Sequence, residues 1–140
     1  MSDVLVVEDD LLIADLLQGA LEAEGYRVSG VARTVAEAKE SAEQHPPNFA
    51  IIDIRLANGD VGTEFGAYLR ATTPSLGIIY STGNGADVGL STLEGDAVMT
   101  KPYRLRDVAR GLEIVEQLRQ LGQTRLRHPR NFRLLDPPAS

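Results

Sequence analysis

Acidic residues follow two short apolar runs of the sequence. Glu8, Asp9 and Asp10 come directly after the run 4–7, and Asp53 closes the run 49–52. If both runs are strands of one sheet, these carboxylates meet at a common edge. Two unit charges about 4 Å apart repel by about 4 kcal/mol at an effective dielectric constant near 20, so a cation or raised pKa values must compensate. Carboxylate oxygens favour Mg2+ or another hard divalent ion.

Asp10 and Asp53 have different local contexts. Asp10 stands immediately before a helix-period segment, where an aspartate is a natural N-cap and needs no other role. Asp53 closes an apolar run and has no adjacent helix to cap. We therefore interpret Asp10 as a cap and Asp53 as a candidate for chemistry.

A hydroxyl group and an ammonium group follow two further apolar runs. Thr82 stands in Ser-Thr-Gly after the run 78–80, and Lys101 stands in Thr-Lys-Pro after the run 97–99. A phosphoryl group on Asp53 would need such partners: a metal to neutralise its oxygens, a hydroxyl donor, and a cation to offset charge during transfer. Each signal alone is common in turns. Their order and combination are specific.

The elements that must position these residues alternate along the chain. Short apolar strand candidates alternate with helix-period segments, of which the stretch 84–95, with three glycines, gives the weakest helical signal. Such alternation predicts an α/β fold with a doubly wound parallel sheet, whose sites lie at the carboxyl edge of the strands. The predicted strands are 4–7, 28–31, 49–52, 78–80 and 97–99, and the predicted helices are 11–24, 34–44, 64–71 and 105–122.

Composition excludes several classes of chemistry. The 140 residues include no cysteine, and His45 and His128 lack metal-ligand spacing, so disulfides, thiolate chemistry and zinc sites are not expected. No apolar run approaches the roughly 20 residues of a membrane span. The first residues do not resemble a secretory signal. We expect a soluble, cytoplasmic protein without a membrane partner.

Charge divides the chain into an acidic body and a basic end. Residues 1–100 carry 16 acidic and 5 basic side chains, whereas residues 101–140 carry 4 and 9, within a net charge of −6. The acidic body argues against direct DNA binding. We expect one domain over 1–121 and a basic tail over 122–140. The tail interleaves arginines with Phe132 and leucines, so it either docks as an extension or is a solvated terminus, which Pro137-Pro138 slightly favours.

Over residues 3–121 the sequence resembles the receiver domain of bacterial two-component response regulators, the CheY-like family. The resemblance is carried by Val-Leu-Val-Val-Glu-Asp-Asp at 4–10, Ile-Ile-Asp-Ile-Arg-Leu at 51–56, Ser-Thr-Gly at 81–83 and Thr-Lys-Pro-Tyr at 100–103. It implies the flavodoxin-like (βα)5 fold with strand order 2-1-3-4-5, and a chain of this length would be a receiver without a typical output domain.

The resemblance also implies a role for each matching residue. Glu8, Asp9 and Asp53 would hold Mg2+, with the backbone carbonyl of Arg55 completing the shell, and Asp53 would accept the phosphoryl group. Three further residues match positions that sense the phosphate or shape its loop: Thr82 as the switch hydroxyl, Lys101 as the phosphate-contacting lysine, and Pro102 as the proline after a cis peptide bond.

The chain departs from the usual family pattern at the aromatic switch. Receivers usually have Tyr or Phe three residues before the lysine, but Val98 stands there. The stretch 80–85 resembles the Phe-Ala-Thr-Gly-x-Gly motif of a subgroup of mostly single-domain receivers that also lack the aromatic, often partnered by HWE-type histidine kinases. The switch is therefore expected to run through Thr82 and the segment 83–95.

The leading hypothesis is a phosphorylation switch, not an enzyme, that takes a phosphoryl group from a sensor histidine kinase or a histidine phosphotransfer protein and signals to an unknown protein target. A homodimer through the face from the strand at 78–80 to the last helix is a further expectation. A phosphorylation-independent binding module is the alternative. A haloacid-dehalogenase-like phosphatase needs an acid where Arg55 stands, and a flavodoxin-type carrier needs a phosphate loop after the first strand, where acids stand instead.

Overall fold

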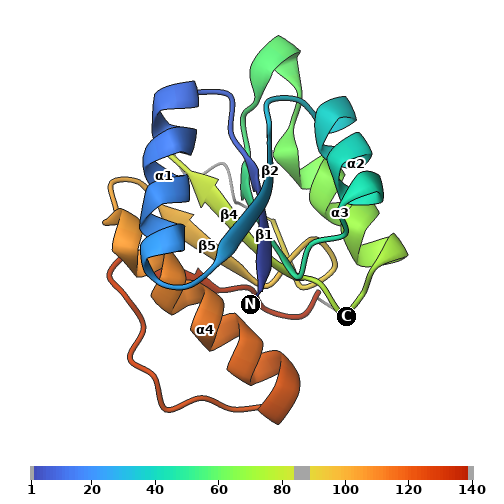
Figure 1. Ribbon diagram of the computed structural model, residues 1–140. Coiled ribbons are helices and arrows are strands. Elements are labelled where there is room, and N and C mark those ends of the chain that lie inside the picture. The colour runs from blue at the N-terminus through green and yellow to red at the C-terminus, as the bar shows by residue number, and fades with distance from the viewer. Residues whose placement is uncertain (1, 84–88, 139–140) are drawn as a thin grey trace.

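A six-stranded sheet forms the centre of the protein (Figure 1). The computed structural model describes residues 2–83 and 89–138. The strand order is β2-β1-β3-β4-β5-β6, with β1 to β5 parallel and β6 antiparallel to β5. The predicted doubly wound sheet of order 2-1-3-4-5 is thus confirmed, with one strand added at its edge. The strands are β1 (Asp3–Val7), β2 (Arg27–Ala32), β3 (Phe49–Asp53), β4 (Gly77–Thr82), β5 (Ala97–Thr100) and β6 (Phe132–Leu134).

Helices cover both faces of this sheet. They are α1 (Leu11–Ala23), α2 (Val35–Gln44), α3 (Gly62–Thr72) and α4 (Leu105–Leu121), with a short 3-10 turn at Ala57–Gly59. Helices α1 and α4 pack on one face and α2 and α3 on the other (Figure 1). Within the described ranges, no helix combines the length and apolar character required to cross a bilayer.

Local capping signals begin two of these helices. The Oδ1 atom of Asp10 accepts hydrogen bonds from the amides of Leu12 and Ile13, at 3.0 and 3.3 Å, which confirms its role as the cap of α1. Thr34 Oγ1 accepts from the amide of Glu37, and the Glu37 carboxylate accepts from the amide of Arg33, one residue before the position it would bond in a capping box. Thr34 therefore caps α2, and the side chain of Glu37 bonds the amide of Arg33 in place of that of Thr34.

Alternation along the strands divides the core into two layers. Val4 and Val6 of β1 face the layer that includes α1 and α4, whereas Leu5 and Val7 face α2 and α3. Strands β3 and β4 are buried along their whole length. Because both faces of these central strands are covered, only their ends are available for polar side chains.

Tyr80 fixes the connection between β4 and β5. Its ring is fully buried and its hydroxyl donates to the carbonyl of Glu94 at 2.6 Å. A Cβ on Gly66 would overlap the hydroxyl of Tyr80, so the glycine is required by this packing. Part of the helix expected weakly at 84–95 lies outside the described residues; the described part from residue 89 forms turns and no helix.

The C-terminal tail supplies β6, which sequence analysis did not identify. Phe132 pairs with Met99 and Leu134 with Ala97. The ring of Phe132 packs against Gly111 of α4, where a Cβ would lie 3.0 Å from it, while Leu135 is buried in the layer of α2 and α3. The structure therefore differs from the solvated terminus that Pro137-Pro138 favoured, because the tail places apolar side chains on both faces of the sheet.

Removal of the Phe132 ring should destabilise the protein. Phe132→Ala leaves a cavity between β6 and α4, and we expect the free energy of unfolding to fall by about 3 kcal/mol. Leu121→Ala is the control, because Leu121 is 69% exposed and its loss should change stability by less than about 0.5 kcal/mol. Urea unfolding of both variants measures the difference. Equal stability of Phe132→Ala and the wild type would contradict the observed packing.

Candidate functional site

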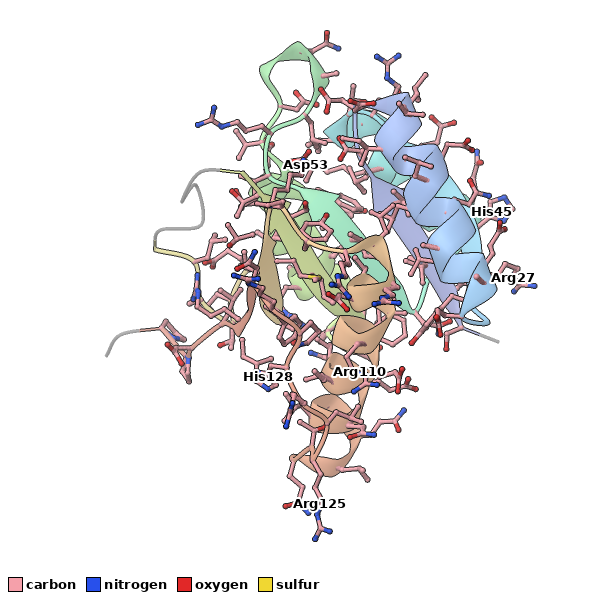
Figure 2. The ribbon with its side chains drawn as sticks, turned by 90° about the vertical axis from the view of Figure 1, so that its left-hand side faces the viewer. Arg27, His45, Asp53, Arg110, Arg125 and His128 are labelled. Atoms are coloured by element: carbon pink, nitrogen blue, oxygen red, sulfur yellow. The ribbon has the colours of Figure 1, made fainter. Side chains whose placement is uncertain are left out.

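The carboxyl ends of β1, β3, β4 and β5 meet at one edge of the sheet, where Figure 2 labels Asp53. Glu8, Asp53 and Thr82 are buried there, with Lys101 half-buried beside them. In the strand register Asp53 stands beside Ser81, and Thr82 beside Thr100. Four separate segments of the chain therefore deliver their polar residues to one place.

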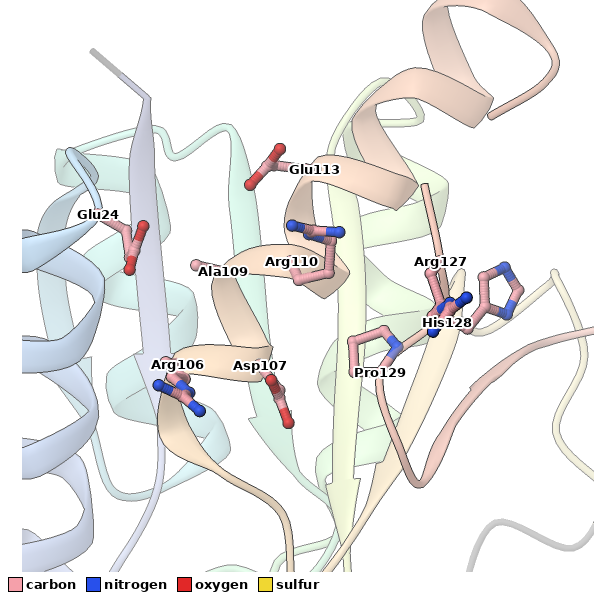
Figure 3. Close-up of a pocket in the computed structure, with 9 residues that line it drawn as sticks. All are labelled: Glu24, Arg106, Asp107, Ala109, Arg110, Glu113, Arg127, His128 and Pro129. Carbon is pink, nitrogen blue, oxygen red and sulfur yellow. The ribbon is translucent and has the colours of Figure 1, made fainter. Parts of the chain in front are cut away.

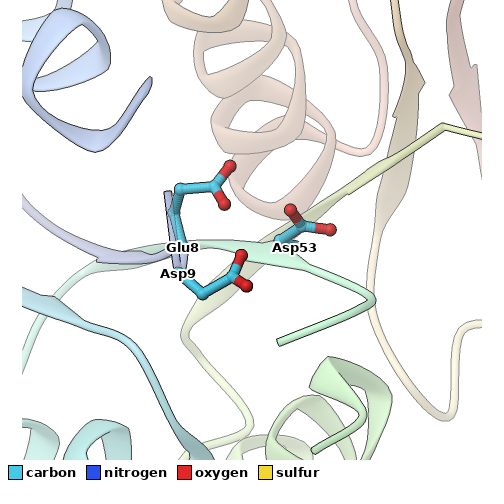
Figure 4. A group of neighbouring side chains, drawn as sticks. All are labelled: Glu8, Asp9 and Asp53. Atoms are coloured by element: carbon cyan, nitrogen blue, oxygen red, sulfur yellow. The ribbon is translucent and has the colours of Figure 1, made fainter. Parts of the chain in front are cut away.

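Three carboxylates form the acidic part of the site (Figure 4). One oxygen each of Glu8, Asp9 and Asp53 lies within 4.8 Å of the others. Glu8 Oε2 accepts from the amide of Asp10 at 3.1 Å, and Asp53 Oδ1 accepts from the amide of Arg55 at 3.2 Å. These bonds orient the two buried carboxylates and bring the backbone of Arg55 against Asp53. The oxygen-only donor set fits a hard divalent cation such as Mg2+.

Lys101 supplies a positive charge to the same group. Its Nζ lies 3.3 Å from Asp53 Oδ2 and 3.8 Å from Glu8 Oε1. Burial lowers the pKa of Lys101, but the carboxylates of Asp53 and Glu8 outweigh that effect, so the pKa is raised overall. The amine therefore stays charged at neutral pH. One ammonium group offsets only part of the charge of three carboxylates.

The pKa of Glu8 reflects both the burial of its side chain and the negative charge that Lys101 does not offset. Burial, together with the repulsion from Asp53, raises the pKa of Glu8 to about 7. A bound cation would favour the ionised form of Glu8 and so compete with its proton. The site thus holds a carboxyl group whose ionisation and metal binding are linked near neutral pH.

Hydroxyl groups from the neighbouring strand β4 also lie near Asp53. Thr82 is 2% exposed, and its carbonyl accepts from the amide of Lys101 at 2.8 Å. A hollow of about 190 Å3 is lined by Asp53, Ile54, Arg55, Thr82, Gly83 and Lys101. Ser81 Oγ and Tyr103 Oη are 2.7 Å apart, a contact that sequence analysis did not foresee. A small anionic group in this hollow would meet a hydroxyl and an ammonium together.

Two of the larger hollows flank the C-terminal tail, away from the three carboxylates of the site. One, of about 350 Å3, lies between α4 and the tail, where Arg106, Arg110 and Arg127 alternate with acids (Figure 3). The other, of about 820 Å3, is lined by residues 102–104, Asp107 and the tail from Arg127 to Asn131. Neither lining includes Asp53, so we assign the chemistry to the small hollow, where a carboxylate, a hydroxyl and an ammonium converge.

The structure brings together the residues singled out in the sequence. Glu8, Asp9, Asp53, Thr82 and Lys101 lie together, and the amide of Arg55 donates to Asp53, while the role expected for the Arg55 carbonyl stays a prediction. The Lys101-Pro102 peptide bond is cis, as the resemblance implied. Val98 is buried in β5 next to Tyr80 of β4. The aromatic ring nearest to Val98 in the register thus comes from the neighbouring strand.

Comparison with known proteins identifies the family. A family model described as "Response regulator receiver domain" matches residues 4–111. The chain belongs to this family. Among solved structures, a CheY-like receiver domain protein from Methanospirillum hungatei JF-1 superposes with a TM-score of 0.76 at 26% identity, over 88% of this chain and 99% of that one. The receiver domain of PhyR from Erythrobacter litoralis gives 0.73 at 21% identity, covering 88% and 95%, which shows a shared fold.

Several curated relatives are regulatory proteins. The photosynthetic apparatus regulatory protein RegA of Cereibacter sphaeroides is 37% identical over 83 residues, which cover 59% of this chain and 44% of RegA. RegA of Rhodovulum sulfidophilum is 32% identical over 112 residues, covering 78% and 60%. The phyllosphere-induced regulator PhyR of Methylorubrum extorquens is 41% identical over 64 residues, covering 45% and 24%. This receiver domain therefore spans less than two thirds of the length of each.

The raised pKa of Glu8 predicts how stability depends on pH. Without divalent cations, the folded protein binds a proton at Glu8 between pH 4.5 and about 7 that the unfolded chain releases, so the melting temperature should fall as pH rises through this window. Mg2+ should raise the melting temperature more above pH 7 than below it, because it binds the ionised form.

Thermal unfolding with EDTA or Mg2+ measures both effects. Glu8→Gln should flatten the EDTA profile, whereas Glu24→Gln, which alters an exposed acid, should leave it unchanged. Asp9→Ala should remove most of the Mg2+ response. A Glu8→Gln profile as steep as that of the wild type would show that another group titrates.

Proposed function

We propose that this receiver domain is a cytoplasmic, Mg2+-dependent phosphorylation switch in which Asp53 accepts a phosphoryl group from a sensor histidine kinase or a histidine phosphotransfer protein. The observation that carries the proposal is that Asp53 lies close to Glu8, Asp9 and Lys101 at once, at the wall of a hollow that Thr82 also lines. Membership of the receiver family supports it.

The residues of the site fit the steps of phosphoryl transfer. A carboxylate oxygen of Asp53 would form the new bond to phosphorus as the bond to the histidine nitrogen of the donor breaks, and the freed imidazole keeps the electron pair. Lys101 would offset the charge on the transferred oxygens, and the Thr82 hydroxyl would donate to one of them. Mg2+ held by Glu8, Asp9, Asp53 and the Arg55 carbonyl would neutralise the remaining charge of the acids and the phosphoryl group.

An exposed apolar patch beside the acids supports docking of the donor protein. Leu11, Leu12 and Leu16 of α1 are 58%, 68% and 54% exposed, and the first two follow directly after Asp10. Apolar patches rimmed by polar residues commonly mark protein interfaces. We propose that the histidine-bearing partner contacts this patch, since its histidine must approach Asp53. A homodimer through the face from β4 to α4 would have to include β6, which covers the outer edge of β5.

The identity of the phosphoacceptor can be tested directly. Incubation with Mg2+ and radiolabelled acetyl phosphate should label the wild type, and Asp53→Asn should abolish labelling because the amide is a far weaker nucleophile than the carboxylate. Asp15→Asn changes an exposed aspartate of α1 and should label normally. Persistent stoichiometric labelling of Asp53→Asn would overturn the assignment.

Thr82 should transmit the phosphorylated state to the connection between β4 and β5. Backbone NMR with Mg2+ and beryllofluoride should show its large perturbations at residues 82–95, because a bond from Thr82 to the phosphoryl group moves the entrance of that connection. Thr82→Ala should quench these changes, and Thr82→Ser, which keeps a hydroxyl, should retain them. Equal perturbations in the alanine variant would exclude Thr82 from signalling.

A further inference from the structure

Asn131, a residue of the tail, makes hydrogen bonds on both sides of Lys101. Its carbonyl accepts from the amide of Thr100 at 2.9 Å, and its side-chain amide Nδ2 donates to the carbonyl of Pro102 at 2.8 Å. One tail residue therefore holds the main chain immediately before and immediately after the lysine that contacts Asp53.

The main chain of Lys101 is held from the opposite side as well. Its amide donates to the carbonyl of Thr82 on β4 at 2.8 Å, so the lysine stands between β4 and the tail. The lysine side chain is 35% exposed and has a flexible four-carbon stem. Whether its Nζ lies 3.3 Å from Asp53 Oδ2 therefore depends on where the backbone of Lys101 is held. Loss of one support should therefore widen the range of positions that Nζ samples.

The tail is well placed to act as that support. Asn131 has φ of 64°, a left-handed conformation that asparagine tolerates better than most residues and that lets it present both groups to the loop. The next residue, Phe132, is 8% exposed, and Leu135 is 6% exposed, so the tail segment that begins with Asn131 is anchored in both layers of the core. Asn131 lies outside the segment 4–111 that the receiver family model matches.

We propose that Asn131 is a positioning residue for Lys101, and that docking of β6 and occupation of the phosphoryl site stabilise each other. The second half rests on the function proposed above for Asp53. Thermodynamic linkage requires the coupling to be reciprocal: if the docked tail raises the affinity of the site for a phosphoryl group by some factor, the occupied site favours the docked tail by the same factor. The tail thus belongs to the switch as well as to the fold.

Two variants of the 140-residue chain remove the side-chain donor in different ways. Asn131→Gly keeps the left-handed backbone and deletes the side chain, whereas Asn131→Asp keeps the shape and replaces the N–H donor by a carboxylate. Arg130→Ala is the matched control, because it removes a neighbouring exposed charge of the tail and leaves Asn131 in place. All three are compared with the wild type and with Asp53→Asn.

Three readouts separate positioning from phosphoryl binding. NMR titration with beryllofluoride in Mg2+ measures affinity, which should fall on the order of fivefold in both Asn131 variants and stay unchanged in Arg130→Ala. The Cε resonance of Lys101 without beryllofluoride should shift in the Asn131 variants, a change that a general loss of stability would not produce. Hydrogen exchange at the amides of Thr100 and Leu135 should slow when beryllofluoride binds the wild type.

The outcomes distinguish this proposal from that for Asp53. Wild-type affinity and an unchanged Lys101 resonance in both Asn131 variants would overturn the positioning role, and an equal loss in Arg130→Ala would assign the effect to charge instead. If the wild type bound no beryllofluoride, the function proposed for Asp53 and the reciprocal coupling would fail together, and the Lys101 resonance would still decide whether Asn131 positions the lysine.

Discussion

The mutual repulsion of Glu8, Asp9 and Asp53 is the constraint on which the rest of the structure depends. Two of these acids are at least nine-tenths buried, and among the described residues the ammonium of Lys101 is the one that lies against them. Burial, together with the repulsion from Asp53, raises the pKa of Glu8 to about 7, and the three carboxylates together could hold a cation. The fold thus keeps an unfavourable arrangement of charges. A proton on Glu8 or a bound metal ion would relieve the repulsion.

Such an arrangement requires a sheet whose central strands stay apolar until they reach their carboxyl ends. Strands β1 and β3 are neighbours, and the first polar residue after each run is an acid, so both carboxylates leave the sheet at the same level. Strands β4 and β5 follow in order and add Thr82 and Lys101. Right-handed parallel crossovers put the helices on both faces, which leaves this edge as the place where the four strand ends are open.

The predictions from sequence were right where the signal is local. The cap at Asp10, the apolar runs and the residue after each run depend on a few neighbouring positions, and they determined five strands, four helices and the shared location of Asp53, Thr82 and Lys101. Strand β6 was not identified because its three residues carry little periodic signal and pair with a distant segment. The bonds of Asn131 to residues 100 and 102 depend on that pairing, so they too were invisible in the sequence.

The tail also determines what can move near the β4–β5 connection. Val98 leaves no aromatic ring on β5, and the buried Tyr80 beside it is held by its bond to Glu94, so neither side chain is free to act as a rotating switch in this arrangement. The backbone of the connection is joined to the tail by the Thr92 amide bonded to Asp136 and by the Leu135 amide bonded to Asp96. Because these bonds tie the two segments together, a rearrangement of the connection large enough to break them also loosens β6, and with it the hydrogen bonds that flank Lys101.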